Sequence, residues 1–186
     1  MSASSEAISA MRVRRVVSGV DDDGRSCVVD DAVAAAQISL LPLGAMIDLW
    51  RPERIPVDRH GHDAPTQVDL NPPLAGFVAR LFVLAPDVEW KHVVDDADVV
   101  EGFKTFGGGT ALHTEGSDRA LDLMHTTPTV DVVYVVSGEV YAVLEDSETK
   151  LSGGDLFVQR GTKHAWSNRS SEPAVLFVVL VSAEGR

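Results

Sequence analysis

Short, mostly apolar runs follow one another through much of the second half of the chain, a pattern typical of β-strands. Four such segments are separated by Ser-Gly, Asp-Ser-Glu, Gly-Thr and Ser-Ser-Glu turns, and they span residues 132–136, 140–144, 156–159 and 175–181. Several short strands at this spacing predict an all-β sandwich or barrel rather than a parallel α/β sheet.

The first half carries a less regular pattern. Residues 13–20 and 26–29 predict a hairpin around the turn Asp-Asp-Asp-Gly-Arg, and residues 77–84 alternate as the first strand of the main barrel. Residues 95–106 begin with acidic side chains and are followed by three glycines, which predicts a short helix with a glycine stop.

Three further segments lack a clear period. Residues 40–50 are apolar but contain Pro42 and Gly44, so we expect an irregular or edge strand. Residues 51–73 are rich in proline and charge and predict a loop. Residues 1–10 are small and polar, and we expect a frayed tail.

Composition narrows the function classes. The chain has 186 residues, enough for one domain with a core, and a formal net charge of −12. Such an acidic surface repels phosphate backbones, so we expect no nucleic-acid partner. No segment approaches the roughly twenty apolar residues that span a bilayer. Cys27 is the only cysteine, which fits a reducing compartment, and we expect a cytoplasmic protein.

Polar residues interrupt the apolar pattern at matched positions. His125, Thr127 and Asp131 share one parity, so an extended backbone would point all three to the same face. His164 is followed at the same parity by Trp166. A carboxylate within an apolar strand is unfavourable unless it is paired, hydrogen-bonded or metal-bound. Two histidines and a carboxylate that converge inside a small barrel predict a metal site.

These two stretches resemble the motifs of the cupins, specifically the small single-domain members of that jelly-roll superfamily. Counting back from Gly138 places Asp131, Thr127 and His125 at the positions where the first cupin motif has Glu and two histidines. In the second motif the matching residues are Gly153, Gly161, His164 and Asn168, with Gln159 in place of the usual proline. The resemblance covers roughly residues 75–184 and implies a double-stranded β-helix, the jelly-roll barrel, with extra N-terminal strands and a short helix.

The resemblance implies a metal centre with an altered ligand set. His125, Asp131 and His164 would hold iron, manganese, nickel or zinc, and the same three residues are the catalytic candidates. Thr127 stands where a histidine ligand is usual and is a poor ligand, while Asp131 is one methylene shorter than glutamate. His113 is a candidate third nitrogen ligand in place of Thr127.

Three functions follow from this comparison. The first is a metal-dependent dioxygenase, decarboxylase, isomerase or lyase. Its substrate would be a small molecule, and the apolar residues Val133, Val135 and Trp166 favour an aromatic or polyketide-like one. The second is a metal-free epimerase or isomerase that uses His–Asp acid–base chemistry. The third is a non-catalytic module that binds a small ligand.

Four residues are candidates for substrate binding: Thr127, Gln159, Arg160 and Trp166. Gln159 and Arg160 flank the turn at Gly161, so one should face inward and the other outward. An inward Arg160 would supply a bidentate anchor for a carboxylate, and an outward Arg160 would be a surface charge. The pair His60 and His62 has a spacing similar to a metal motif, but it lies in the proline-rich segment, and we interpret it as a solvated loop.

The chain divides into residues 1–75, expected to pack on the barrel or on a partner subunit, and residues 76–186, the cupin barrel. Extra N-terminal strands in cupins often pack on a second subunit. We therefore expect a homodimer.

Overall fold

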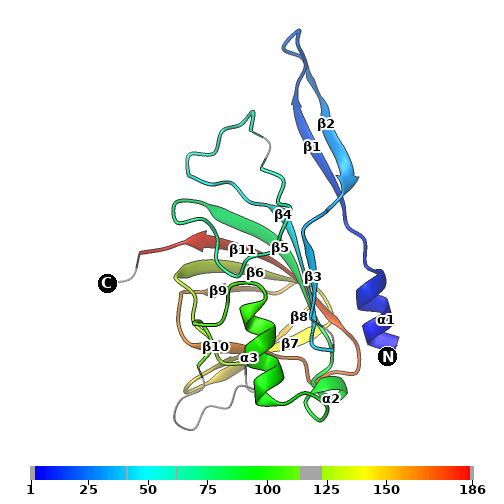
Figure 1. Cartoon of the computed structure of the whole chain (residues 1–186), viewed down its shortest axis with the longest axis vertical. Helices are drawn as coiled ribbons and strands as arrows, with labels where there is room; N and C mark the ends of the chain where they lie inside the picture. Colours follow the sequence, from blue (N-terminus) through cyan, green and yellow to red (C-terminus); the bar gives the residue numbers. More distant parts are fainter. Residues whose placement is uncertain (1–2, 41, 62, 114–122, 185–186) are drawn as a thin grey trace.

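The computed structural model describes residues 3–40, 42–61, 63–113 and 123–184 (Figure 1). Its helices are α1 (Ala3–Ala10), α2 (Asp87–Trp90) and α3 (Asp96–Lys104). Its strands are β1 (Arg14–Val20), β2 (Ser26–Val33), β3 (Gln37–Ser39), β4 (Gly44–Trp50), β5 (Phe77–Leu84), β6 (Thr129–Ser137), β7 (Glu139–Leu144), β8 (Glu148–Ser152), β9 (Leu156–Gln159), β10 (His164–Ser167) and β11 (Ala174–Ser182). None of these helices, within the described part of the chain, is long and apolar enough to cross a membrane.

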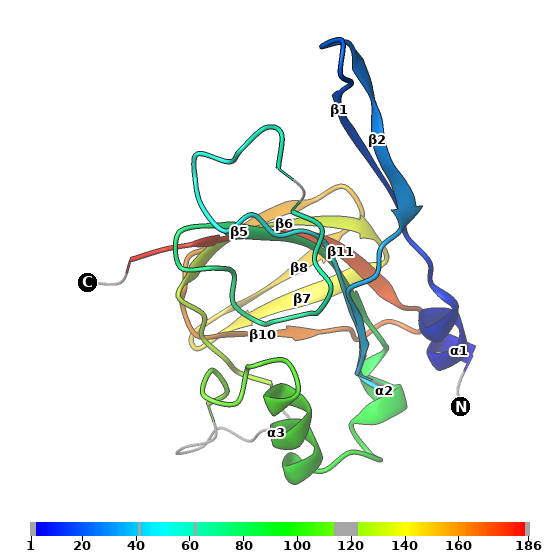
Figure 2. The ribbon, with the colours of Figure 1, turned by 45° about the horizontal axis from the view of Figure 1, so that its top comes forward.

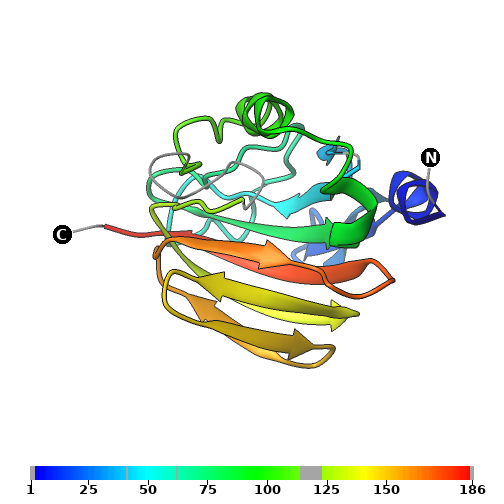
Figure 3. The ribbon, with the colours of Figure 1, turned by 90° about the horizontal axis from the view of Figure 1, so that it is seen from below.

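Two antiparallel sheets form the body of the molecule. One has the strand order β3-β4-β5-β11-β6-β9, and the other has the order β10-β7-β8. The sheets form two layers, and α3 lies outside both of them (Figures 2 and 3). Strands that are distant in sequence, such as β5 and β11, are direct neighbours. The protein is therefore an all-β jelly roll, in agreement with the sandwich or barrel that the spacing of the strands predicted and with the jelly roll that the cupin resemblance implied.

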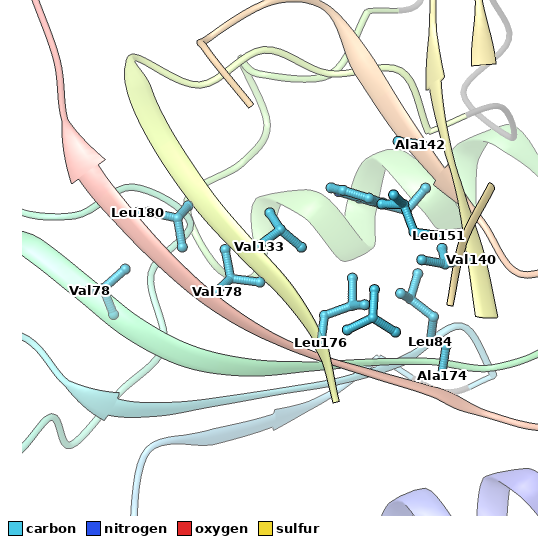
Figure 4. Close-up of a cluster of buried hydrophobic side chains, with 12 residues drawn as sticks. Val78, Leu84, Val133, Val140, Ala142, Leu151, Ala174, Leu176, Val178 and Leu180 are labelled. Carbon is cyan, nitrogen blue, oxygen red and sulfur yellow. The ribbon is translucent and has the colours of Figure 1, made fainter. Parts of the chain in front are cut away.

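The main core fills the space between the two layers. Along β6 and β11, every second residue is buried, so each strand contributes one face to the interior. Val133, Leu176 and Val178 of the larger sheet belong to the same buried cluster as Val140 and Leu151 of the smaller sheet (Figure 4). Burial of each such side chain contributes about 1.5–3 kcal/mol to folding.

The predicted strands and the predicted helix are present. Residues 77–84 and 156–159 coincide with β5 and β9, and the predicted hairpin is the pair β1–β2. Helix α3 begins after Asp95, whose side chain accepts a hydrogen bond from the backbone N–H of Asp98 in a capping box. Gly107 follows with a positive φ of 77°, the conformation that ends helices.

The prediction of a frayed tail over residues 1–10 was wrong. Residues 3–10 form α1, and Ile8 is only 1% exposed because it packs with Ala45, Val83 and Trp90. The Ser4 hydroxyl also donates a hydrogen bond of 2.8 Å to the Glu89 carboxylate. Long-range packing, which local composition does not reveal, orders this segment.

The strands before residue 75 behave in two ways. β3 and β4 join the main sheet beside β5, so they extend the layer that residues 76–186 build. The hairpin β1–β2 projects away from the body (Figure 1). It exposes a set of valines: Val16, Val20, Val28, Val29 and Val33. The outer face of β6 and β9 also exposes apolar side chains: Val130, Val132, Tyr134, Val136, Leu156 and Val158.

Candidate functional site

A cavity of about 100 Å³ lies within the sandwich. Most of its wall is apolar and comes from β4, β5, β6, β10, β11 and α3. Its polar wall includes His125, Thr127, Asp131, His164 and Arg80. A mainly apolar cavity with a few convergent polar groups is the usual form of a small-molecule site. We refer to it below as the inner cavity.

The two histidines are held together by backbone pairing. His125 and His164 form an isolated antiparallel bridge: the N–H of each donates to the carbonyl of the other, at 2.8 and 3.0 Å. Residues paired in this way place their side chains on the same face of a sheet. The imidazole centroids are accordingly 4.3 Å apart, with the ring planes at 48°.

Both imidazoles are oriented by main-chain carbonyls. His125 Nδ1 lies 2.8 Å from the Leu123 carbonyl, and His164 Nδ1 lies 2.9 Å from the Thr162 carbonyl. A carbonyl can only accept, so each Nδ1 carries the proton and each neutral ring has a bare Nε2. Burial lowers the pKa of His125, and burial with the adjacent His125 lowers the pKa of His164 to about 3. The site therefore holds two neutral imidazoles with acceptor nitrogens.

Asp131 is an incompletely satisfied carboxylate. It is 5% exposed, and among the described residues its Oδ1 has no hydrogen-bond partner. Burial raises the pKa of Asp131 to about 6, against the opposing effects of a hydrogen bond from Thr129 and of the Arg80 charge. The Thr127 and Thr129 hydroxyls lie 2.7 Å apart and join Thr127 to the same network. The free oxygen is available to a ligand that brings a donor.

Arg80 is a polar residue of the cavity wall that the sequence analysis missed. It lies on β5, is 2% exposed, and its Nε is 2.9 Å from the Asp48 carboxylate. Its guanidinium also donates to the Asp69 and Leu70 carbonyls. The position of Arg80 in its strand could have indicated that it faces inward, because Val78 and Phe82, two residues before and after it, also face the core. Asp48 therefore compensates much of the Arg80 charge.

Two of the four predicted substrate-binding residues line the inner cavity, and two do not. Thr127 and Trp166 line the inner cavity. Gln159 is buried, but its amide donates to the Thr162 backbone carbonyl at 2.8 Å and to its hydroxyl at 2.7 Å, so it holds the turn before β10 and does not line the cavity. Arg160 is exposed on the outside and also does not line the cavity.

The additional histidines lie elsewhere. His113 Nε2 is 2.6 Å from the Thr126 hydroxyl, and His113 is absent from the wall of the inner cavity. His60 is exposed in the loop between β4 and β5, and its neighbour His62 lies outside the described residues.

The predicted metal ligands do not form a three-residue group. In the part of the chain that the structure describes, no three His, Cys, Asp or Glu side chains are grouped so that they could hold a metal ion. The carbonyls that accept from the two Nδ1 atoms resemble the outer-shell partners that orient histidine ligands in many metal sites. The donor set of this structure nevertheless provides two ligands where a facial triad needs three.

One family model matches the segment of the chain that carries the two histidines and Asp131. Residues 115–180 match the family model described as "Cupin domain". This chain contains a cupin domain. The match includes both histidines and Asp131, and it confirms the resemblance that the two sequence motifs indicated.

Curated relatives of this cupin come from fungi. Phomopsin biosynthesis cluster protein C' of Diaporthe leptostromiformis is 49% identical over 70 residues, 37% of each chain. Oryzines biosynthesis cluster protein J of Aspergillus oryzae is 37% identical over 65 residues, 34% of this chain and 36% of the other. The matched segments thus span little more than a third of these relatives.

Solved structures align with this chain at low sequence identity. A cupin 2 conserved barrel domain protein from Salinispora arenicola aligns with a TM-score of 0.35 and 15% identity, over 57% of this chain and 64% of the other. A putative ethanolamine utilization protein from Salmonella typhimurium aligns with a TM-score of 0.44 and 10% identity, over 94% of this chain and all of the other.

Proposed function

We propose that this cupin binds a small, mainly apolar biosynthetic molecule in the inner cavity and transfers a proton on it without a metal ion. The observation that carries the proposal is the buried Asp131 Oδ1, which has no hydrogen-bond partner among the described residues. An unpaired buried carboxylate oxygen is unfavourable, and a ligand hydroxyl or acidic C–H would meet it directly. The curated relatives are named as biosynthesis cluster proteins, which supports a small biosynthetic substrate.

The chemistry follows from the protonation states. With a pKa of about 6, Asp131 is mostly ionised at neutral pH yet close enough to accept and return a proton. It would remove a proton from one substrate atom and return it to another, an isomerisation that needs no oxidant. The bare Nε2 atoms of His125 and His164 would accept hydrogen bonds from substrate hydroxyls. The apolar wall, including Val133 and Trp166, favours an aromatic or polyketide-like substrate.

A metal-dependent reaction is the competing proposal. The carbonyl-anchored Nδ1 atoms of both histidines favour it, since they leave two imidazole nitrogens ready to bind iron, manganese, nickel or zinc. Among the described residues no third ligand joins the two imidazoles, which disfavours it. Chelator sensitivity separates the two proposals.

Hydrogen–deuterium exchange at the α-carbon of 2-hexanone tests proton transfer directly. NMR in D₂O, with protein kept in EDTA, would follow the rate for wild type, Asp131→Asn and the exposed-site control Asp146→Asn. We expect the wild type and the control to exceed Asp131→Asn by at least about tenfold, because a positioned acid–base group contributes about 10²–10⁴. Equal rates for wild type and Asp131→Asn would refute this role. Exchange that is absent in EDTA but appears once EDTA is removed and iron is added would support the metal-dependent proposal instead.

A further inference from the structure

A second cavity lies directly outside the inner one. Its volume is about 410 Å³, and it is lined by residues of α3 and of the segments around residues 39–43 and 93–94. Apart from Asp98 and two hydroxyl residues, its side chains are apolar. We call it the outer cavity.

The two cavities share one wall. Leu40, Leu43, Phe103 and Phe106 line both of them. The Phe103 ring is 5.3 Å from the Phe106 ring and 5.8 Å from the His125 imidazole, so this wall reaches the polar group of the inner cavity. Its side chains are apolar throughout, and it carries no charge that would stop an apolar chain from passing along it.

Size indicates how the cavities are used. An engineered cavity of about 150 Å³ in another protein holds one benzene molecule, so about 100 Å³ suits only the end of a larger molecule. The outer cavity is about four times as large, and the four side chains of the shared wall form part of the wall of both cavities. A biosynthetic substrate that reaches Asp131 therefore needs space beyond the inner cavity.

We propose that the outer cavity binds the apolar tail of an elongated substrate whose hydroxyl or carbonyl end lies against Asp131 in the inner cavity. This inference rests on the proposed function, because it takes Asp131 as the residue that holds the polar end. It adds the substrate class: a chain or fused-ring molecule with one polar end and an apolar remainder.

Gly102 offers a precise way to fill the outer cavity. It lies on α3 and lines the outer cavity but not the inner one. A Cβ at this position meets nothing within 4 Å, and its φ is not in the left-handed region. Leucine has a higher helix propensity than glycine, so Gly102→Leu should fold at least as well as wild type. Ala97→Leu is the matched control, because Ala97 is exposed on the same helix and lines neither cavity.

The test measures the affinity of primary alcohols from 1-butanol to 1-decanol by titration calorimetry. For wild type and Ala97→Leu, we expect affinity to rise roughly fourfold with each added methylene, because each one is buried. For Gly102→Leu, we expect an unchanged affinity for 1-butanol and no further rise for the longer alcohols. The same rise in Gly102→Leu as in wild type would overturn the outer-cavity proposal.

A second variant separates this outcome from failure of the proposed function. Asp131→Asn should weaken 1-butanol binding about tenfold while keeping the rise with chain length. If 1-butanol binds Asp131→Asn and wild type equally, but Gly102→Leu still removes the rise in affinity with chain length, binding of the tail in the outer cavity is supported and the role of Asp131 is refuted. If Asp131→Asn weakens binding and Gly102→Leu changes nothing, the role of Asp131 is supported and the outer-cavity proposal is refuted.

Discussion

Replacing Asp131 by asparagine should stabilise the folded protein, by an amount that grows as pH rises from about 4 to 6 and is full at neutral and higher pH. The carboxyl is 5% exposed, and burial raises its pKa from 3.8 to about 6. Below pH 3.8 the group is protonated in both the folded and the unfolded chain, so it contributes no penalty. As pH rises to 6, the unfolded chain releases the proton first and the folded state loses stability. Above pH 6 the penalty is complete.

The magnitude follows from the pKa values. One pKa unit corresponds to about 1.4 kcal/mol, so the rise to about 6 corresponds to about 3 kcal/mol of unfolding free energy at pH 7. His164 has the opposite effect, because its pKa is lowered to about 3 and the unfolded chain binds a proton below pH 6.5. The two slopes oppose each other between pH 4 and 6. The difference between variant and wild type isolates the contribution of Asp131.

Urea denaturation at pH 4, 5, 6, 7 and 8 would measure this difference. Asp131→Asn should exceed wild type by less than about 1 kcal/mol at pH 4 and by about 3 kcal/mol at pH 7 and 8. The control Asp146→Asn, on an exposed turn, should stay within about 0.5 kcal/mol of wild type throughout. A difference of equal size at pH 4 and pH 7, or an asparagine variant less stable than wild type at pH 7, would refute the reasoning.

Three further predictions concern the ion pair, the metal and the assembly. Arg80→Met should lower the unfolding free energy by about 3–5 kcal/mol in urea denaturation, because it leaves a buried carboxylate uncompensated; a loss below about 1 kcal/mol would contradict this. Protein purified without a histidine tag or chelators should hold well below one metal ion per chain by elemental analysis. Stoichiometric metal that disappears in His125→Ala would argue against that expectation. We propose that a second copy of the chain packs on the hairpin β1–β2, since an isolated hairpin is marginal in water. Sedimentation velocity should then show a dimer that Val28→Lys dissociates and Leu74→Lys, in an exposed loop, does not; a monomeric wild type at tens of micromolar would refute the assembly.

Short apolar runs separated by turn residues predicted most of the strands, because β-branched and aromatic side chains pack well on a pleated sheet. Parity along the chain also placed Asp131 on the inward face, between Thr129 and Val133. It did not predict β8, whose sequence Glu-Thr-Lys-Leu-Ser has one buried residue and therefore little apolar signal. Helix α1 was missed for a different reason: its order depends on contacts with residues far along the chain.

Within the site, the sequence indicated which residues face inward but not which partners satisfy them. Gln159 and Arg160 were both candidates for the cavity, and the structure gives Gln159 to a turn and Arg160 to the surface. Arg80 was overlooked because an arginine in a strand is usually exposed; its buried partner Asp48 lies 32 residues away. The distances among three possible ligands depend on strand register, and the spacing of the residues along the sequence does not determine these distances.

The backbone bridge between His125 and His164 fixes where these two side chains lie without depending on which side chains they are. The two hydrogen bonds that hold the strands in register come from main-chain atoms, so they persist whichever residues occupy the two positions. Either imidazole can therefore be exchanged for another side chain without changing where that side chain points. The same frame is open to evolutionary divergence and to redesign, in which new chemistry is installed at two adjacent positions while the surrounding sheets stay unchanged.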